Sequence, residues 1–345
     1  MSSDITFTIA QKFPPAGLAE AWRDCLTRGE LPSHYVTPEY LLESQFAVER
    51  PFAVLAVDCR GAVTGVLTGL HQGHHLECGQ ISRPQICFDS GADLRATADA
   101  LARGMLEEAR AETVLSVYSW TLVDAFRHFG FRMRSTEGVV VLDLTQGPEA
   151  VFKQFDENRR RNIRAAINHG VEVFQASTRE DFAAAYQVYL AWLQTPRKKI
   201  VWNKMSFAMF ERMLRLSANR RLFLARHSGK VIAGVSLRFF PRGLLEFAAN
   251  WSLDEFMKLR PNDLLHWRAI EWACREGFPR YSLGGAHPFL RRFGGTVAPV
   301  YRYRLDRTWL RRHDLREAMS DRAREWFERL PKPIAQGVRR FLGKS

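Results

Sequence analysis

The sequence predicts a mixed α/β fold made of two tandem copies of one unit, followed by a C-terminal helical tail. Three observations support this prediction. Stretches of alternating apolar and polar residues joined by short turns indicate antiparallel strands. Apolar residues spaced three and four apart indicate amphipathic helices. The same succession of motifs occurs twice, so we expect two mixed sheets, each flanked by helices.

Composition fits two domains of a cytoplasmic protein. The chain has 345 residues, of which 46% are hydrophobic, enough for a core in each unit. No apolar run approaches the ~20 residues of a membrane span, and no secretory signal is visible. The five cysteines form no CxxC pair. They fit reduced thiols better than a disulfide framework or a zinc site, so we expect no metal.

Charge divides the chain into two unlike halves. Residues 1–150 hold 12 Lys+Arg and 19 Asp+Glu, a net charge of −7, whereas residues 151–345 hold 38 and 18, a net charge of +20. A basic half suggests a polyanionic partner, which could be nucleic acid, a phosphorylated cofactor or an anionic membrane surface. The alternative is a soluble surface rich in arginine.

The repeat is clearest in two predicted three-strand meanders. FAVLAVDCRGAVTGVLTGLHQGHHLE has the same plan as LFLARHSGKVIAGVSLRFFPRGLLEF, with turns at Asp58–Gly61 and Ser228–Gly229. Gly65 matches Gly234, and the pair Leu76-Glu77 matches Leu245-Glu246, both at an offset of 169 residues. We therefore interpret the meanders as equivalent parts of two copies.

The match continues beyond the meanders. The apolar face of one helix, Ala98, Leu101 and Met105, matches that of another, Trp267, Ile270 and Cys274. FRHFGF (126–131) then matches LRRFGG (290–295), and the strand VVVLDL (139–144) matches YRYRLD (301–306). Each unit therefore reads helix, helix, three strands, helix, strand, short helix, strand.

The expected domains follow from this order. Residues 1–147 form the first unit, with opening helices at 16–28 and 38–48. Residues 148–308 form the second unit, with a linking helix over 148–169 and opening helices at 178–194 and 204–217. Residues 309–345 form a basic amphipathic helical tail, interrupted by Pro331 and Pro333.

This order of elements resembles the GNAT acyltransferase fold, present twice. The motifs RRRNIRAAINHGVEV, LLHWRAIEWACREGFPRYSLGG and FLRRFGG resemble those of the Fem-type (FemAB-like) peptidoglycan aminoacyltransferases and their acetyltransferase-like relatives. The resemblance implies transfer of an acyl group onto an amine, with no cofactor beyond the co-substrate. In the Fem branch, aminoacyl-tRNA donates to the peptide of a peptidoglycan precursor. In the relatives, the donor is an acyl-CoA.

The sequence departs from the family in three places. It has no long heptad stretch for the two-helix arm that Fem-type enzymes often carry. It has Leu290-Arg291-Arg292 where a Phe-Lys pair is common, so the role of that lysine passes to Arg291 or Arg292. It also lacks the glycine-rich Q/R-x-x-G-x-G/A pattern of acyl-CoA enzymes.

The chemistry implied by the resemblance needs no protein nucleophile. The donor is already activated, so alignment of the substrates can supply on the order of 7–11 kcal/mol. What remains is a neutral amine and donors for the developing oxyanion. The absence of a G-x-S-x-G motif is consistent with this.

The segment SLGGAHPFLRRFGG is the first candidate for the site. Gly284 and Gly285 permit close approach of a substrate. Arg291 and Arg292 could hold a phosphate or stabilise an oxyanion, and His287 could carry the amine proton. The alternative is a tight turn with a surface histidine.

The predicted linking helix carries the second candidate. Arg159 lies four residues from both Phe155 and Ile163, so it falls on the inward face, whereas Arg161 and Arg164 fall toward solvent. Arg159 would bind either a phosphate, bidentately, or a carboxylate of the acidic first domain.

The loop LDEFMKLRPNDLLHW is the third candidate. Pro261 suits the first turn of a helix, so free N–H groups near Asn262 and Asp263 could bind a pyrophosphate, with Lys258 and Arg260 adding charge. The alternative is a helix capped by Asn262 or Asp263.

Two further sets remain open. Glu246 and Asn250 share a parity on one strand, and Glu246 could accept a proton, although its match to Glu77 also suggests a shared structural role. Trp192 begins a loop of interleaved aromatic and basic residues, AWLQTPRKKIVW, that suits nucleic acid or a phosphorylated acceptor, or is a plain surface loop. His266 we expect to be packed rather than catalytic.

Three hypotheses follow. The first is a Fem-like N-(amino)acyltransferase acting on a cell-envelope precursor. The second is an acyl-CoA-dependent N-acyltransferase with a small-molecule or protein amine as acceptor. The third is a non-catalytic protein that binds RNA or a membrane surface. The expected partners are a phosphorylated substrate (tRNA, CoA or a lipid-linked precursor) and, peripherally, an anionic membrane at the inner face.

Overall fold

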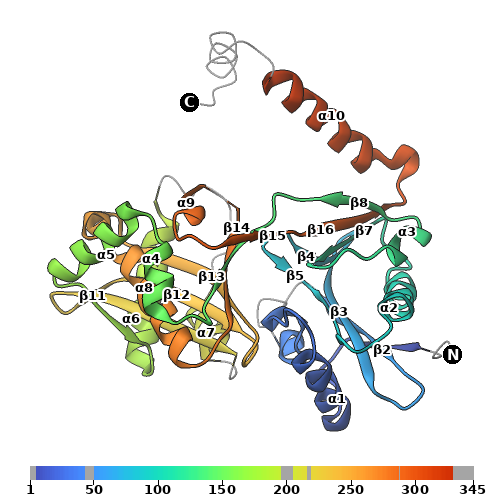
Figure 1. Cartoon of the computed structure of the whole chain (residues 1–345), viewed down its shortest axis with the longest axis horizontal. Coiled ribbons are helices and arrows are strands. Elements are labelled where there is room, and N and C mark those ends of the chain that lie inside the picture. Colours follow the sequence, from blue (N-terminus) through green and yellow to red (C-terminus); the bar gives the residue numbers. More distant parts are fainter. Residues whose placement is uncertain (1–4, 43–49, 196–204, 216–218, 287, 329–345) are drawn as a thin grey trace.

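Two mixed sheets lie side by side, and each is covered by helices (Figure 1). The computed structural model describes residues 5–42, 50–195, 205–215, 219–286 and 288–328. The predicted α/β class, with two mixed sheets flanked by helices and a C-terminal helix, is confirmed. Among the described residues, no helix has both the length and the apolar character needed to cross a bilayer.

The first sheet has the strand order β1-β2-β3-β4-β7-β16-β8, with β5 beside β4 and β6 beside β3. The bounds of its strands are β1 Thr6–Ala10, β2 Arg50–Val57, β3 Val63–Gln72, β4 His75–Gln80, β5 Arg83–Pro84, β6 Ile86–Phe88, β7 Val114–Ser119, β8 Arg132–Ser135 and β16 Tyr301–Asp306. The helical segments around it are α1 Ala16–Thr27, η1 His34–Val36, η2 Pro38–Leu42, α2 Leu94–Glu108 and α3 Ala125–His128.

The second sheet has the order β10-β11-β12-β13-β14-β9-β15. Its strands are β10 Glu172–Gln175, β11 Arg220–His227, β12 Lys230–Phe239, β13 Leu244–Ser252, β14 Arg280–Gly285, β9 Val139–Asp143 and β15 Thr296–Ala298. Its helical segments are α4 Pro148–Gln154, α5 Glu157–Asn168, α6 Arg179–Leu193, α7 Phe207–Arg215, η5 Asp254–Leu259, α8 Pro261–Arg275 and α9 Pro288–Arg291.

The repeat found in the sequence corresponds to a structural repeat. Helix α2 buries Ala98, Leu101 and Met105 against its sheet, and α8 buries the matching Trp267 and Ile270. Gly65 is required for the close packing of α2, because a Cβ at this position would lie 2.4 Å from Cγ2 of Thr97. In both sheets the meander is followed by a parallel pair, β4 with β7 and β13 with β14.

The last strands of the two units are exchanged. Val139–Asp143 pairs with β14 and β15 in the second sheet, while Tyr301–Asp306 pairs with β7 and β8 in the first. The repeat predicts that each of these strands pairs within the unit that precedes it. The observed pairing instead places each strand in the sheet of the other unit. The physical reason is that the two strands are equivalent in the repeat, so each fits the vacant position of either sheet. The domain boundaries at residues 147 and 308 therefore stay a prediction.

Two helices differ from their predicted extent. Residues 148–168 form two helices rather than one, because Phe155 is extended and the side chain of Asp156 caps α5 by accepting from the N–H of Arg159. The helix expected at 38–48 is a 3₁₀ segment at Pro38–Leu42, and residues 43–49 lie outside the described residues.

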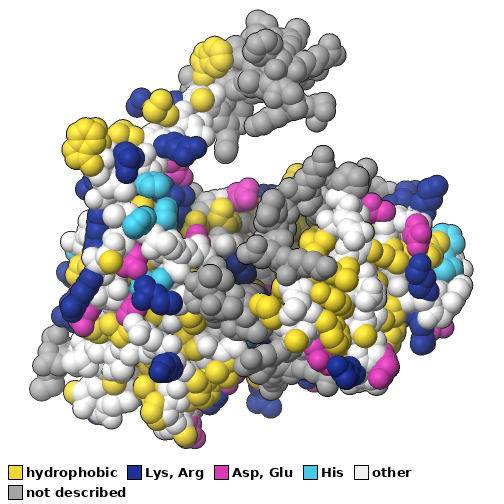
Figure 2. Space-filling model, turned by 180° about the vertical axis from the view of Figure 1, so that it is seen from behind, with side chains coloured by type: hydrophobic (Ala, Val, Ile, Leu, Met, Phe, Trp, Pro, Cys, Tyr) yellow, Lys and Arg dark blue, Asp and Glu magenta, His cyan; other side chains and the backbone are white. Residues whose placement is uncertain are grey.

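The tail begins with a short 3₁₀ turn, η6 Trp309–Arg311, and continues as α10 Arg312–Glu328. It projects from the first sheet away from both bodies (Figures 1 and 2). The rest of the predicted tail, residues 329–345, lies outside the described residues.

Candidate active site

The parallel pair β13–β14 is split. The two strands pair only from Leu244 with Arg280 to Glu246 with Ser282, and then separate although both continue. Strand β13 also contains a bulge, since Ser236 pairs with Ala249 and the next residue, Leu237, pairs with Phe247. Ala248 is therefore the extra residue that the β12–β13 register leaves out. The split therefore lies between the strand that carries Glu246 and Asn250 and the strand that ends at Gly284 and Gly285.

A hollow of about 190 Å³ lies at the N-terminus of α8. Arg260 has φ 61°, in the left-handed region, and Pro261 follows as the first helical residue. No side chain among the described residues caps this helix, so the alternative of a cap by Asn262 or Asp263 is not observed. Backbone N–H groups at an uncapped helix N-terminus attract anions. The lining residues are Asn158, Arg159, Asn162, Met257, Arg260, Pro261, Asn262, Asp263 and Arg292.

Arg159 is buried with 4% of its surface exposed, as its inward position predicted. It forms an ion pair with Asp263 of α8, and the Asn162 side chain donates to the same carboxylate at 3.2 Å. Its guanidinium also lies 4.7 Å from the ring centre of Phe293. Its carboxylate partner belongs to the second unit, not to the acidic first domain. Arg161 and Arg164 are exposed, as expected.

The segment from Gly285 to Arg292 borders two hollows. Arg292 lines the hollow at α8 and lies 3.8 Å from Asp156. Arg291 donates to the carbonyl of Ala286 at 3.0 Å. At its other end, Gly285 lines a hollow of about 460 Å³ shared with the first unit. Of the four predicted residues, Arg292 therefore lines one hollow and Gly285 lines the other, whereas Gly284 and Arg291 line neither.

The hollow between the units is acidic on the side of the first unit. Glu77 of β4 and Tyr118 of β7 line it, together with the exposed Glu137. A Cβ on Gly285 would lie 3.6 Å from Oε1 of Glu137, an ordinary van der Waals distance, so Gly285 and Glu137 are close neighbours without steric need for a glycine. No sequence pattern indicated Glu137 or Tyr118 as a site residue, and Glu77 was noted only as the match to Glu246.

Glu246 occupies a different environment from Glu77. It is 2% exposed, and neither of its carboxylate oxygens reaches solvent. Burial raises its pKa to about 8, against the opposing charges of Arg238 and Arg83. Glu246 therefore faces the contact with the first unit rather than an open volume.

The bulge also separates Glu246 from Asn250. Leu245 and Phe247 pack in the core cluster of α8, whereas Ala249 and Trp251 pack in the cluster of α6. Alternate residues thus change faces at Ala248, and the two side chains expected on one side point to opposite sides. Asn250 is half-buried.

The remaining candidates are dispersed. Lys258 is exposed beside the α8 hollow, and Trp192 is half-buried, stacked on Tyr189 in the core below α6. His287 lies outside the described residues, as do the basic residues of the 196–204 loop.

His266 is packed as expected, between Phe247 and Phe293, with Nδ1 3.2 Å from the Tyr281 hydroxyl. Burial, and then the charge of Arg159, lower its pKa to about 4, so it is neutral at pH 7. Within the ranges that the structure describes, no cluster of three or more metal-ligating side chains occurs.

Comparison with known proteins finds a family match within the second unit. Residues 154–292 match the family described as an acetyltransferase (GNAT) domain. None of the curated proteins matches the chain. Similarity to solved structures covers both units at low identity, which shows the fold.

Three of these structures are similar over most of their length. A crystal structure of FemX has a TM-score of 0.63 at 13% identity, covering 84% of this chain and 96% of that one. The C-terminal domain of a putative lysylphosphatidylglycerol synthetase from Agrobacterium fabrum has 0.57 at 13%, covering 88% and 96%. A tandem GNAT protein from the clavulanic acid biosynthesis pathway has 0.54 at 16%, covering 88% and 99%.

Proposed function

We propose, from the match of residues 154–292 to an acetyltransferase (GNAT) domain, that this acyltransferase transfers an aminoacyl group from aminoacyl-tRNA to an amine of a cell-envelope precursor. The observation that carries the proposal is the segment Gly285–Arg292, which borders both the hollow at α8 and the hollow between the units. A donor in one and an acceptor in the other would meet along this segment.

The hollow at α8 suits the phosphate-bearing donor. Arg260 and Arg292 line it, and the uncapped helix N-terminus adds partial positive charge. Asp263 lines it as well, but its charge is balanced by Arg159. The net charge of +20 on residues 151–345 favours a large polyanion such as tRNA.

The hollow between the units suits the acceptor amine. Glu77 and Glu137 would attract an ammonium group, and one of the carboxylates would take the proton that the amine must lose to attack. The amine nitrogen then bonds to the donor carbonyl carbon. As the tetrahedral intermediate collapses, the nitrogen loses its second proton to solvent, and the tRNA 3′ oxygen or CoA sulfur leaves with the proton returned by the carboxylic acid. Likeness to a putative lysylphosphatidylglycerol synthetase supports a lipid-linked acceptor.

The second candidate is an acyl-CoA-dependent N-acyltransferase with a small-molecule or protein acceptor. The match to the acetyltransferase description favours it, and so does a helix N-terminus that could hold a pyrophosphate. The two candidates differ in the donor, which can be measured directly.

The test is to incubate the protein separately with labelled aminoacyl-tRNA and labelled acetyl-CoA and to follow binding and acceptor-dependent loss of label. We expect tRNA binding that weakens steeply with salt. Arg292→Ala should weaken donor binding roughly tenfold or more, whereas Arg164→Ala, an exposed arginine on α5 away from the hollow, should not. Binding of acetyl-CoA without binding of aminoacyl-tRNA would overturn the first candidate in favour of the second.

A further inference from the structure

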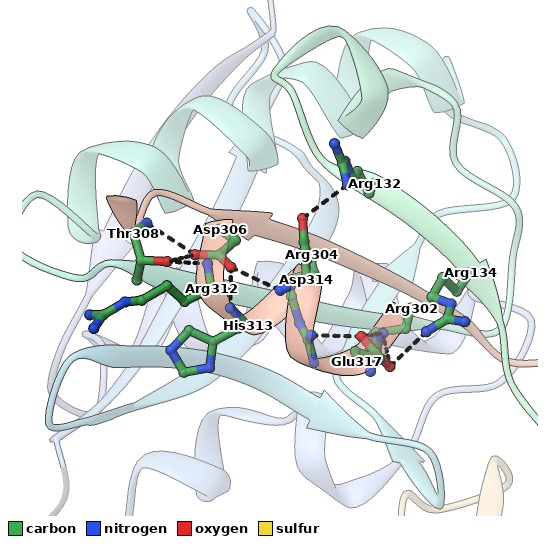
Figure 3. Close-up of polar contacts among 10 residues, drawn as sticks. All are labelled: Arg132, Arg134, Arg302, Arg304, Asp306, Thr308, Arg312, His313, Asp314 and Glu317. Carbon is green, nitrogen blue, oxygen red and sulfur yellow. Dashed lines mark hydrogen bonds and ion pairs between the residues drawn. The ribbon is translucent and has the colours of Figure 1, made fainter. Parts of the chain in front are cut away.

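Helix α10 is fixed at its start by Asp306, the last residue of β16 (Figure 3). The Asp306 carboxylate accepts from the N–H groups of His313 at 2.9 Å and Asp314 at 3.0 Å, and from the Thr308 hydroxyl at 2.6 Å. Burial opposes its ionisation, but these hydrogen bonds outweigh burial and hold the pKa of Asp306 below its ordinary value. The first turn of the helix is therefore tied to the first sheet.

One side of α10 is acidic and is paired with arginines of that sheet (Figure 3). Glu317 is the centre of this contact, and several arginines hold its pKa low against the effect of burial. The pairs are Glu317 with Arg302 at 2.6 Å, with Arg304 at 2.7 Å and with Arg134 at 2.9 Å, Asp314 with Arg132 at 3.5 Å, and Asp321 with Arg134. These contacts turn the acidic side of the helix toward the protein.

The opposite side of α10 is apolar and exposed. Leu315, Met319 and Trp326, here called the outer stripe, are spaced four and seven residues apart, so they share one face. Their exposed fractions are 52%, 70% and 64%. Trp309 and Leu310, just before the helix, are also exposed. Figure 2 shows hydrophobic and basic side chains together on this projecting element.

The outer stripe is edged by arginines. Arg312 lies three residues before Leu315, Arg316 three before Met319, and Arg322 four before Trp326, so each lies beside the stripe. All three are exposed. Apolar side chains with tryptophan, flanked by arginine on an otherwise projecting helix, have the composition of a helix that lies in the plane of an anionic bilayer interface.

We infer that the outer stripe of α10 docks the protein on an anionic lipid surface. The charges favour this occupant over a second copy of the chain. A two-fold contact would place the stripe against itself and bring Arg312, Arg316 and Arg322 against the same residues of the other copy. A surface of lipid phosphates instead complements them, and Asp314, Glu317 and Asp321, which it would repel, are paired with arginines of the sheet. The inference is independent of the identity of the acyl donor.

The test is co-sedimentation of the full chain with vesicles of phosphatidylcholine alone and of phosphatidylcholine mixed with phosphatidylglycerol. We expect binding only to the mixed vesicles, weakening with salt. Arg316→Glu with Arg322→Glu should lower the apparent affinity at least about tenfold. Leu315→Ser with Met319→Ser should lower it without any change in net charge, which separates insertion from simple attraction.

The matched control is Arg60→Glu with Arg110→Glu, an equal charge change at exposed sites of the first unit. It should keep affinity within about twofold, because neither residue belongs to α10 or to the outer stripe. Circular dichroism of every variant checks folding. Absence of binding to the mixed vesicles would overturn the inference, and so would equal losses in the control and α10 variants. A dimer in sedimentation that the Leu315→Ser, Met319→Ser variant abolishes, without vesicle binding, would assign the stripe to a second copy.

Discussion

The ion pair of Arg159 with Asp263 allows a quantitative prediction. It joins α5 to α8 in the lining of the hollow at α8, and both residues are almost fully buried. The perturbation is a double-mutant cycle of Arg159→Met, Asp263→Leu and the two together. Each single change leaves one buried charge without its opposite charge, whereas the double change leaves none.

The magnitudes follow from the surroundings. Removing one partner of a buried pair costs roughly 3–5 kcal/mol. Asp263→Leu leaves the arginine charge at 4% exposure over Phe293, so we expect about 4 kcal/mol. After Arg159→Met, Asp263 still accepts from Asn162 and still lies in the first turn of α8, so we expect about 3 kcal/mol. The double variant leaves no unpaired charge, so it should lose less than either single variant, which corresponds to a coupling energy of at least about 4 kcal/mol.

The assay is urea unfolding of the four proteins, followed by fluorescence and by circular dichroism to check that the transitions coincide. Asn158→Ala, at the rim of the same hollow, is a control that should change the free energy of unfolding by less than about 1 kcal/mol. Additive single losses, with no coupling energy, would refute the assignment of Arg159 to a structural pair and return it to the role of a phosphate ligand.

Three further predictions concern the site and the fold. Glu77→Gln should lower kcat by on the order of 100-fold with the KM of the donor unchanged, as expected for a proton acceptor on the acceptor side; an equal rise in donor KM would contradict this role. The pKa of Glu246 is about 8 when folded, raised above the value of 4.5 that it has unfolded, so its contribution to stability is present below pH 4.5 and is lost as pH rises toward 8. Glu246→Gln should flatten that part of a stability-against-pH curve, and an unchanged curve would count against the assignment. Gly295→Ala should cost more than about 3 kcal/mol, because φ is 83° and the new Cβ would lie 2.5 Å from the Val141 carbonyl oxygen. Gly277→Ala, at φ 76° with open space around it, should cost only about 1–2 kcal/mol, so equal losses of unfolding free energy for the two would disprove the steric explanation.

The sequence by itself determined the kind of fold and most of its elements. Hydrophobic periodicity is a local property, so α2, α8 and both meanders could be predicted from patterns such as Ala98, Leu101 and Met105. The repeat of those patterns predicted two equivalent units. The sequence also indicated residues 284–292 as a candidate site, because two glycines after a predicted strand, followed by two arginines, can be recognised without coordinates.

Only the tertiary structure decided which distant segments meet. The strands at 139–143 and 301–306 are equivalent in the repeat, so no local pattern could show that they exchange sheets. The bulge at Ala248 moved Asn250 to the face opposite Glu246, because one extra residue inverts the alternation on which the prediction relied. Arg159 forms its ion pair with Asp263 of the second unit rather than with a carboxylate of the first unit. Glu77, rather than Glu246, lines an open hollow. The physical reason is the same in each case: periodicity fixes which face of an element is buried, whereas the partner on that face is set by long-range packing.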